Sequence, residues 1–151
     1  MSKLTLTNMC MIHDLQTDMV VVIDRVKTYK GISFPGGHIK DGEGIVDSVK
    51  REIFEETGLT IDLLEPCGVI YWYNEDNGDR YFVFNYRTTS YKGVLKESCE
   101  EGRVFWVKKD EMIKLNLSEG ITERLPMFFE KKFNEGFSSY NSKQKNPLTF
   151  Y

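Results

Sequence analysis

Hydrophobic residues recur along the chain in short blocks, and most of these blocks have the spacing of strands. A compact β-branched run at Met19–Ile23 predicts a buried strand. Aromatic residues alternate with other residues in Arg80–Thr88, and the turn residues Glu75–Asp79 come before it, so we expect a hairpin. The other expected extended segments are Leu4–His13, Gly31–Phe34, Thr60–Leu64, Val69–Tyr73 and Val104–Val107.

Helical spacing is confined to three segments. Gly44–Thr57 is the clearest, because Gly58 follows it in the position of a C-cap. Helices are also expected over Lys109–Leu115 and Ile121–Phe133. Many strands with few helices predict an α/β or α+β sandwich. We expect one domain over residues 1–134 and a polar, partly mobile C-terminal tail over residues 135–151.

Composition narrows the possible partners. A length of 151 residues fits one domain that can bury its own core. The net charge of −3 and the lack of a basic stripe argue against binding to long nucleic acids. Clustered carboxylates instead suit a protein that binds divalent cations.

Cysteine usage and hydropathy suggest a compartment. The three cysteines lack the spacing of a zinc site, and we expect reduced thiols. No signal peptide and no apolar run of membrane-spanning length is visible. We therefore expect a cytoplasmic protein that does not associate with membranes.

The segment Gly37–Leu59 carries the candidate chemistry. Glu52, Glu55 and Glu56 stand at positions i, i+3 and i+4, which share one side of a helix. Like charges so close repel each other, and a divalent cation offsets that repulsion. Carboxylate oxygens are the ligands that Mg²⁺ and Mn²⁺ prefer, so the spacing points to a metal site.

Two further features of this segment need an explanation beyond solubility. Glu56 projects near Val49, within the apolar side formed by Ile45, Val46, Val49 and Ile53, where an unpaired carboxylate is costly. Arg51 precedes Glu55 by four residues and can orient it. The Gly36-Gly37 turn can bring a backbone carbonyl to a metal ion.

Simpler interpretations exist for each part of the segment. Glu-rich helices commonly present a solvated face, and glycines between a strand and a helix are commonly plain turn residues. Neither interpretation accounts at once for the glycines, Glu43, the arginine and the glutamate pair.

Together these residues resemble the Nudix family. The segment matches the Nudix box, G-x5-E-x7-R-E-U-x-E-E-x-G-U, in which U is a bulky apolar residue. The specified positions are filled by Gly37, Glu43, Arg51, Glu52, Ile53, Glu55, Glu56, Gly58 and Leu59. The resemblance implies an α/β/α sandwich with a central mixed sheet, and a domain that hydrolyses nucleoside diphosphates linked to another group.

Residue roles follow from the resemblance position by position. It implies Glu52, Glu55 and Glu56 as catalytic Mg²⁺ or Mn²⁺ ligands, the Gly36 carbonyl as a further ligand, and Glu43 in support. Arg51 would orient a carboxylate at the catalytic centre. A water attacks phosphorus while the metal neutralises the phosphate oxygens. Glu52 is the first candidate for the general base, and Glu100 and Glu101 are alternatives.

The substrate is less closely defined. The sequence FPGG directly before the box resembles the MutT-like branch, which hydrolyses oxidised nucleoside triphosphates such as 8-oxo-dGTP to the monophosphate and pyrophosphate. Arg25 corresponds to an arginine that contacts phosphates, although it also fits a surface arginine that ends a strand. Candidate substrate contacts are Phe34, Gly37 and Trp72, with Tyr73 and Trp106 as further aromatic walls and Asn8 or Asn116 at the base edge.

Two alternatives remain. One is a Nudix hydrolase of ADP-ribose, a dinucleoside polyphosphate or an RNA 5′ end. The other is a non-catalytic nucleotide-binding regulator, which the complete set of box carboxylates disfavours. In each case the expected partner is a nucleotide, and the chain is expected to be a monomer or a homodimer.

Overall fold

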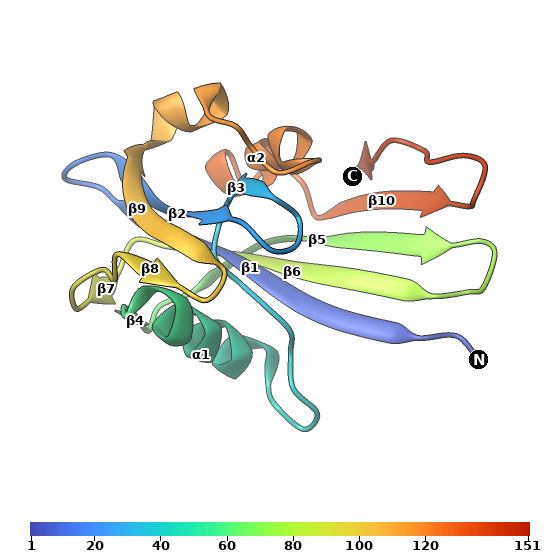
Figure 1. The fold of residues 1–151 in the computed structure, drawn as a ribbon, viewed down its shortest axis with the longest axis horizontal. Helices are drawn as coiled ribbons and strands as arrows, with labels where there is room; N and C mark the ends of the chain where they lie inside the picture. Colours follow the sequence, from blue (N-terminus) through green and yellow to red (C-terminus); the bar gives the residue numbers. More distant parts are fainter.

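A mixed β-sheet forms the centre of the protein. The computed structural model describes all 151 residues, and Figure 1 shows the arrangement of its elements. In chain order these are β1 (Leu4–Asp14), β2 (Met19–Arg25), β3 (Gly31–Ser33), α1 (Ile45–Thr57), β4 (Thr60–Ile61), β5 (Glu65–Asn74), β6 (Arg80–Thr88), β7 (Tyr91–Lys92), β8 (Ser98–Cys99), β9 (Gly102–Lys108), the 3-10 helix η1 (Lys109–Lys114), α2 (Ile121–Phe129), β10 (Glu135–Tyr140) and β11 (Thr149–Phe150).

The strands of the main sheet run in the order β11-β10-β5-β6-β1-β2-β9-β8, with β3 beside β2. β1 is parallel to β6 and β10 is parallel to β5, whereas the remaining neighbours are antiparallel. The expected mixed sheet with few helices is therefore confirmed. β4 and β7 form a separate small sheet. No helix here has both the length and the apolar character needed to span a bilayer.

Alternation along β1 and β2 divides the core into two layers. Successive side chains of a strand point to opposite faces. Met11, Val20 and Val22 face one cluster, which also holds Leu125, Met127 and Phe128 of α2. Cys10, Ile12, Val21 and Ile23 face the other, which holds Val49 and Ile53 of α1. The two helices therefore cover opposite faces of the sheet, as a sandwich requires (Figure 1).

The segment expected to be a polar tail, residues 135–151, instead adds two strands to the sheet. β10 pairs with β5 from Glu135↔Val69 to Tyr140↔Asn74, and β11 folds back onto β10. The sequence pattern did not predict β10, because polar residues such as Ser138 and Ser139 interrupt its apolar positions. Strand pairing uses backbone groups, so it does not require apolar side chains. The Phe133 and Phe150 rings pack with centroids 5.2 Å apart and fix the end of the chain.

Three expected elements are shorter or tighter than their patterns predicted. α2 ends at Phe129 rather than Phe133, and Lys131 beyond it has a left-handed backbone (φ 51°) that no α-helix continues through. Lys109–Lys114 is a 3-10 helix, and only Thr60–Ile61 of the expected strand Thr60–Leu64 is paired. Val46, expected on the apolar side of α1, is 41% exposed.

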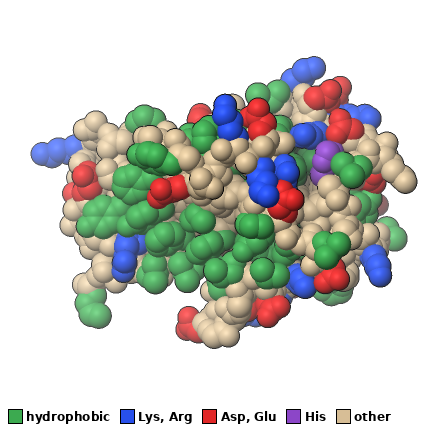
Figure 2. Space-filling view, turned by 180° about the vertical axis from the view of Figure 1, so that it is seen from behind, with side chains coloured by type: hydrophobic (Ala, Val, Ile, Leu, Met, Phe, Trp, Pro, Cys, Tyr) green, Lys and Arg blue, Asp and Glu red, His purple; other side chains and the backbone are tan.

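Aromatic side chains also join the outer strands of the sheet. The Tyr71 ring stacks on Phe82 with centroids 4.5 Å apart, and it also contacts Phe137 of β10. Such cross-strand pairs stabilise neighbouring strands. Figure 2, which views the molecule from behind, shows hydrophobic side chains gathered over one half of the surface and charged side chains mainly over the other.

Candidate functional site

Helix α1 positions the box carboxylates. Its C-terminus is closed by Gly58, whose left-handed backbone (φ 79°) lets its N–H reach the Phe54 carbonyl. Its buried side consists of Ser48, Val49, Ile53, Glu56 and Thr57. Glu56 therefore faces inward with the apolar residues, as the helical spacing predicts.

The turn before α1 is held against β1 by hydrogen bonds. Asn8 and Cys10 of β1 donate their N–H groups to the carbonyls of Gly37 (2.8 Å) and Pro35 (2.9 Å). The Asn8 side chain accepts from the Gly37 N–H (3.2 Å) and donates to Ser48 Oγ of α1 (2.9 Å). Asn8 thus ties β1, the turn and α1 together, and its amide is occupied by this role rather than free to recognise a base. Asn116 is exposed in the loop after η1.

The backbone of Gly36 packs tightly against the backbone of β1. A Cβ at residue 36 would lie 2.2 Å from the Asn8 carbonyl oxygen, so only glycine fits. The carbonyls on either side of Gly36, from Pro35 and Gly37, point to β1, so in an extended chain the Gly36 N–H and C=O point away from it. The Gly36 N–H donates to Glu56 Oε1 (2.8 Å). The Gly36 carbonyl accepts no hydrogen bond from the protein.

Glu56 is a buried carboxyl group that no basic side chain pairs with. Glu56 lies on the buried side of α1 and is 7% exposed. Its carboxyl group accepts a hydrogen bond from the Gly36 N–H. Burial raises the pKa of Glu56 to about 8; Glu52 and Glu101 act in the same direction, whereas the Gly36 N–H and Arg25 oppose it. Without a cation the carboxyl is therefore mostly protonated at neutral pH, and a bound cation would favour its charged form.

A testable consequence concerns the stability of the metal-free protein. The folded state keeps a proton on Glu56 up to a pKa of about 8, whereas the unfolded chain releases it near pH 4.5. The contribution of Glu56 to the free energy of unfolding is therefore greatest below pH 4.5 and falls as pH rises to 8, by a few kcal/mol at most.

Chemical denaturation in EDTA at pH 5 and at pH 8 measures this effect. We expect Glu56→Gln to gain stability relative to the wild-type protein as pH rises, because glutamine has no proton to lose. Equal differences between the two proteins at both pH values would show that Glu56 ionises normally.

Arg51 organises the other box carboxylates. Its guanidinium donates to Glu43 Oε2 (2.7 Å), Glu52 Oε1 (2.9 Å), Glu55 Oε2 (3.2 Å) and the His38 carbonyl (3.0 Å). Hydrogen bonding to Arg51 lowers the pKa of Glu43 to about 2. Sequence spacing predicted the contact with Glu55 alone, and the contact with Glu43 arises because the loop before α1 folds back onto the helix.

The structure thus divides the expected metal ligands into two groups. Glu52 and Glu56 meet at the glycine turn: a Cβ at residue 37 would lie 2.5 Å from Glu52 Cδ, and Gly36 binds Glu56. Glu43 and Glu55 gather around Arg51, which also binds Glu52 and so joins the two groups, and the Glu55 side chain is 52% exposed. No three acidic, histidine or cysteine side chains stand ready as a complete metal cage.

Arg25 and Glu101 border this turn from the end of β2 and the loop before β9. Their side chains form an ion pair (Nη2–Oε2 3.1 Å), and Arg25 Nε donates to the Thr28 carbonyl (3.1 Å). Both act electrostatically on the pKa of Glu56: Arg25 lowers it and Glu101 raises it. Glu100, the neighbouring candidate base, is exposed. The pairing of Arg25 with Glu101 was not predicted, because β2 and β9 become neighbours only in the folded sheet.

The candidate aromatic walls are dispersed. Phe34 is 1% exposed and packs on Phe128 with centroids 4.8 Å apart, so it belongs to the core in this structure. Trp106 packs on Tyr91 and against the core cluster on the α1 face. Trp72 lies on the α2 face, where it contacts Tyr81 and Arg124. Tyr71 and Tyr73 point to the other face, as alternation along β5 requires.

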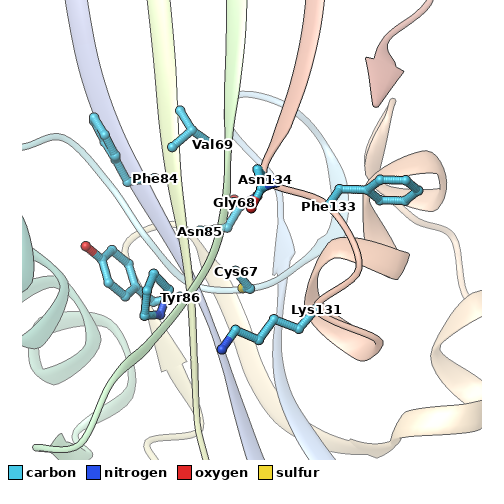
Figure 3. Close-up of a pocket in the computed structure, with 10 residues that line it drawn as sticks. Cys67, Gly68, Val69, Phe84, Asn85, Tyr86, Lys131, Phe133 and Asn134 are labelled. Atoms are coloured by element: carbon cyan, nitrogen blue, oxygen red, sulfur yellow. The ribbon is translucent and has the colours of Figure 1, made fainter. Parts of the chain in front are cut away.

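The cavity drawn in Figure 3 lies away from all of these groups. Its volume is about 360 Å³, and it opens at the bulge of β5 between Pro66 and Val69. Cys67, Asn85 and Lys131 are among its lining residues (Figure 3), and no predicted site residue is. The box residues therefore lie outside this cavity.

Comparisons with known proteins agree with this geometry. The model of the NUDIX domain family matches residues 4–128. The protein named Uncharacterized Nudix hydrolase YvcI, from Bacillus subtilis, is 32% identical over 110 residues, which cover 70% of this chain and 69% of that protein. The Oxidized purine nucleoside triphosphate hydrolase of Mus musculus is 31% identical over 97 residues, covering 64% of this chain and 62% of the mouse protein.

Solved structures show the same fold. The crystal structure of a MutT protein from Bacillus halodurans superimposes with a TM-score of 0.78 at 24% identity, and the match covers 97% of each chain. The family match spans the glycine turn, α1 and the strands that hold them. The chain belongs to the NUDIX domain family, as a hydrolase of phosphoric anhydride bonds with a MutT-like fold.

Proposed function

We propose that this protein is a magnesium-dependent nucleotide pyrophosphohydrolase, which converts nucleoside triphosphates, including oxidised ones such as 8-oxo-dGTP, to the monophosphate and pyrophosphate. One observation carries the proposal: the carboxyl groups of Glu52 and Glu56 meet at a glycine turn whose Gly36 carbonyl has no partner. Two carboxyl groups of α1 thus lie beside the turn that carries the Gly36 carbonyl.

The donor set fits Mg²⁺ or Mn²⁺. Both ions prefer oxygen ligands, and Mg²⁺ keeps several waters, so it needs few groups from the protein. Glu52, Glu56 and the Gly36 carbonyl would hold the ion, with Glu55 and Glu43 adding negative charge from the Arg51 side. When bound, the ion neutralises phosphate oxygens and lowers the pKa of its water.

The chain's own groups do the rest. Arg51 fixes the orientation of Glu52 through its N–H (2.9 Å). The attacking water gives its proton to a carboxylate, its oxygen bonds to phosphorus, and the bond between that phosphorus and the pyrophosphate oxygen breaks. Glu52 is our first choice of proton acceptor. Glu101 is the alternative, because it is half-buried and acts on the pKa of Glu56, while Glu100 is exposed.

The choice of substrate draws on the name of one relative. The mouse relative is named for oxidised purine nucleoside triphosphates, and the alignment spans less than two thirds of its length.

The free cysteines Cys10, Cys67 and Cys99 suit a cytoplasmic enzyme.

A substrate panel tests the proposed function. The purified protein is incubated with Mg²⁺ and 8-oxo-dGTP, dGTP, ADP-ribose or triphosphorylated RNA, and the products are separated by chromatography. We expect pyrophosphate and a nucleoside monophosphate from the triphosphates, with the highest kcat/KM for an oxidised purine. Preferred cleavage of ADP-ribose or RNA would reject the proposed substrate, and binding without cleavage would indicate a regulator.

The role of Arg25 gives a separate prediction. The phosphate oxygens of a triphosphate bound at the turn can accept hydrogen bonds from the Arg25 guanidinium. In the structure this guanidinium pairs with Glu101. We expect Arg25→Ala to raise KM for triphosphates by roughly 10-fold, the loss of one charge-assisted contact. Steady-state kinetics measure this. Arg103→Ala, an exposed arginine on β9, is the matched control. Unchanged KM in Arg25→Ala would leave Arg25 with a structural role alone.

A further inference from the structure

Arg124, in α2, is a buried arginine without an acidic partner. It is 6% exposed, and it forms none of the ion pairs of the protein. Its Nε–H group has no hydrogen-bond acceptor. By contrast, Arg25, Arg51 and Arg87 each pair with a carboxylate.

The surroundings of Arg124 are mostly aromatic and sulfur groups. Its Nη2 lies 3.6 Å from the sulfur of Met9, which is a weak acceptor, and its Cζ lies 5.7 Å from the centre of the Trp72 ring. Trp72 in turn packs edge-on against Tyr81, with centroids 5.8 Å apart. A guanidinium offers five N–H donors, and here the only protein acceptor is the weak one of the Met9 sulfur.

Such an arrangement costs free energy. A buried charge needs a partner and hydrogen bonds to offset its lost hydration. Burial lowers the pKa of Arg124 to about 10, which still leaves it charged at neutral pH. A group kept charged, buried and unpaired is poorly explained by stability, and well explained by a ligand that supplies acceptors.

Arg124, on the α2 face of the sheet, is connected to the proposed active site through Met9 of β1. Its neighbour Met9 directly follows Asn8, whose side chain binds the Gly37 N–H. The Met9 Cα lies 2.8 Å from the position of a Cβ at residue 36, so Met9 touches the turn that holds the carboxylates. A nucleotide with its phosphates at this turn could extend its base past Met9, toward Trp72 and Arg124.

We propose that Arg124 is a specificity-determining residue, which recognises the oxygen at position 6 of a purine while Trp72 packs against the base. This inference rests on the proposed function. The occupant is a base rather than a second phosphate, because an aromatic ring and a thioether border the guanidinium, whereas charged groups border the turn.

Purine chemistry makes the preference specific. Arginine donates two hydrogen bonds to the O6 and N7 acceptors of guanine, a pairing that distinguishes bases in DNA. Adenine carries an amino donor at position 6, which cannot accept from a guanidinium. Arg124 therefore favours 6-oxo purines over 6-amino purines. An ordinary 6-oxo purine accepts at O6 and N7, whereas an 8-oxo purine, whose N7 carries a proton, accepts from Arg124 at O6.

Binding of dIMP and dAMP, measured by calorimetry without metal, tests this directly. Neither nucleotide has a 2-amino group. They differ in that dIMP has an oxygen at position 6 and a proton on N1, whereas dAMP has an amino group at position 6 and no proton on N1. We expect the wild-type protein to bind dIMP roughly 10- to 100-fold more tightly than dAMP. Arg124→Met should abolish this preference by weakening dIMP binding alone, and Arg124→Lys, which keeps the charge without the planar fork, should reduce it.

Controls separate recognition from folding. Arg80→Met changes an exposed arginine beside Tyr81 and should keep the preference. Arg124→Met should melt at the same temperature as the wild-type protein or higher, because it removes an unpaired buried charge. A lack of preference in the wild-type protein, an equal loss for both nucleotides, or a preference that survives both substitutions would overturn the proposal. A dIMP preference without pyrophosphate release from any triphosphate would reject the proposed function and leave this inference intact.

Discussion

Glu56→Gln is expected to lower kcat for nucleotide hydrolysis by at least 10²- to 10³-fold, the range seen when an electrostatic group at a reacting centre is removed. Glutamine has the size of glutamate and can still accept from the Gly36 N–H, so the turn should keep its geometry. What it loses is the charge with which the buried side chain would bind a cation. Pyrophosphate release under saturating substrate and Mg²⁺ measures the effect.

A matched control is available for Glu56. Glu111→Gln changes an exposed glutamate in η1 and should leave kcat unchanged. Circular dichroism should show that Glu56→Gln is folded, since burial disfavours the charge that the substitution removes. Near-normal turnover in a folded Glu56→Gln protein would mean that Glu56 is not a metal ligand.

The second large effect is expected for Arg51. Arg51→Ala removes the group that holds Glu43, Glu52 and Glu55, and leaves their carboxylates to repel each other. Loss of a residue that orients metal ligands commonly lowers activity by roughly 10- to 100-fold. Arg51→Lys keeps one charge but cannot bind several carboxylates through a planar fork, so we expect an intermediate rate. Steady-state kinetics over a range of Mg²⁺ concentrations measure both variants.

Lys50→Ala is the control for Arg51. Lys50 is the preceding residue of α1 and forms an exposed pair with Asp62 (3.2 Å), which contributes little to stability. Its removal should change neither kcat nor the Mg²⁺ dependence. If Arg51→Ala behaves like Lys50→Ala, the carboxylates are positioned by the helix alone and need no arginine.

Local features of α1 could be predicted from the sequence because they depend on residues close together in the chain. Gly58 closes the helix as its position indicates, and Glu56 faces the core as its spacing from Val49 indicates. The sharp turn was also predictable from the adjacent glycines Gly36 and Gly37, whereas the close approach of Gly36 to β1 was not. Each of these needs only helical periodicity or glycine geometry.

Features that depend on distant pairing could not be predicted in this way. β10 joins the sheet through backbone bonds to β5, although its sequence is largely polar. Phe34 follows a short strand near the candidate site, yet it packs into the core against Phe128 of α2. Likewise, Arg124 lies at helical spacing with apolar residues, and nothing in the sequence marks it as lacking an acidic partner.

The central claim is that the glycine turn and α1 hold a divalent ion, which enables nucleotide cleavage to a monophosphate and pyrophosphate. Incubating the wild-type protein with 8-oxo-dGTP and dGTP, in Mg²⁺ or in EDTA, with both products quantified, tests it most directly. We expect equal amounts of monophosphate and pyrophosphate in Mg²⁺ and no turnover in EDTA. Turnover that persists in EDTA, or release of inorganic phosphate and a nucleoside diphosphate, would contradict it.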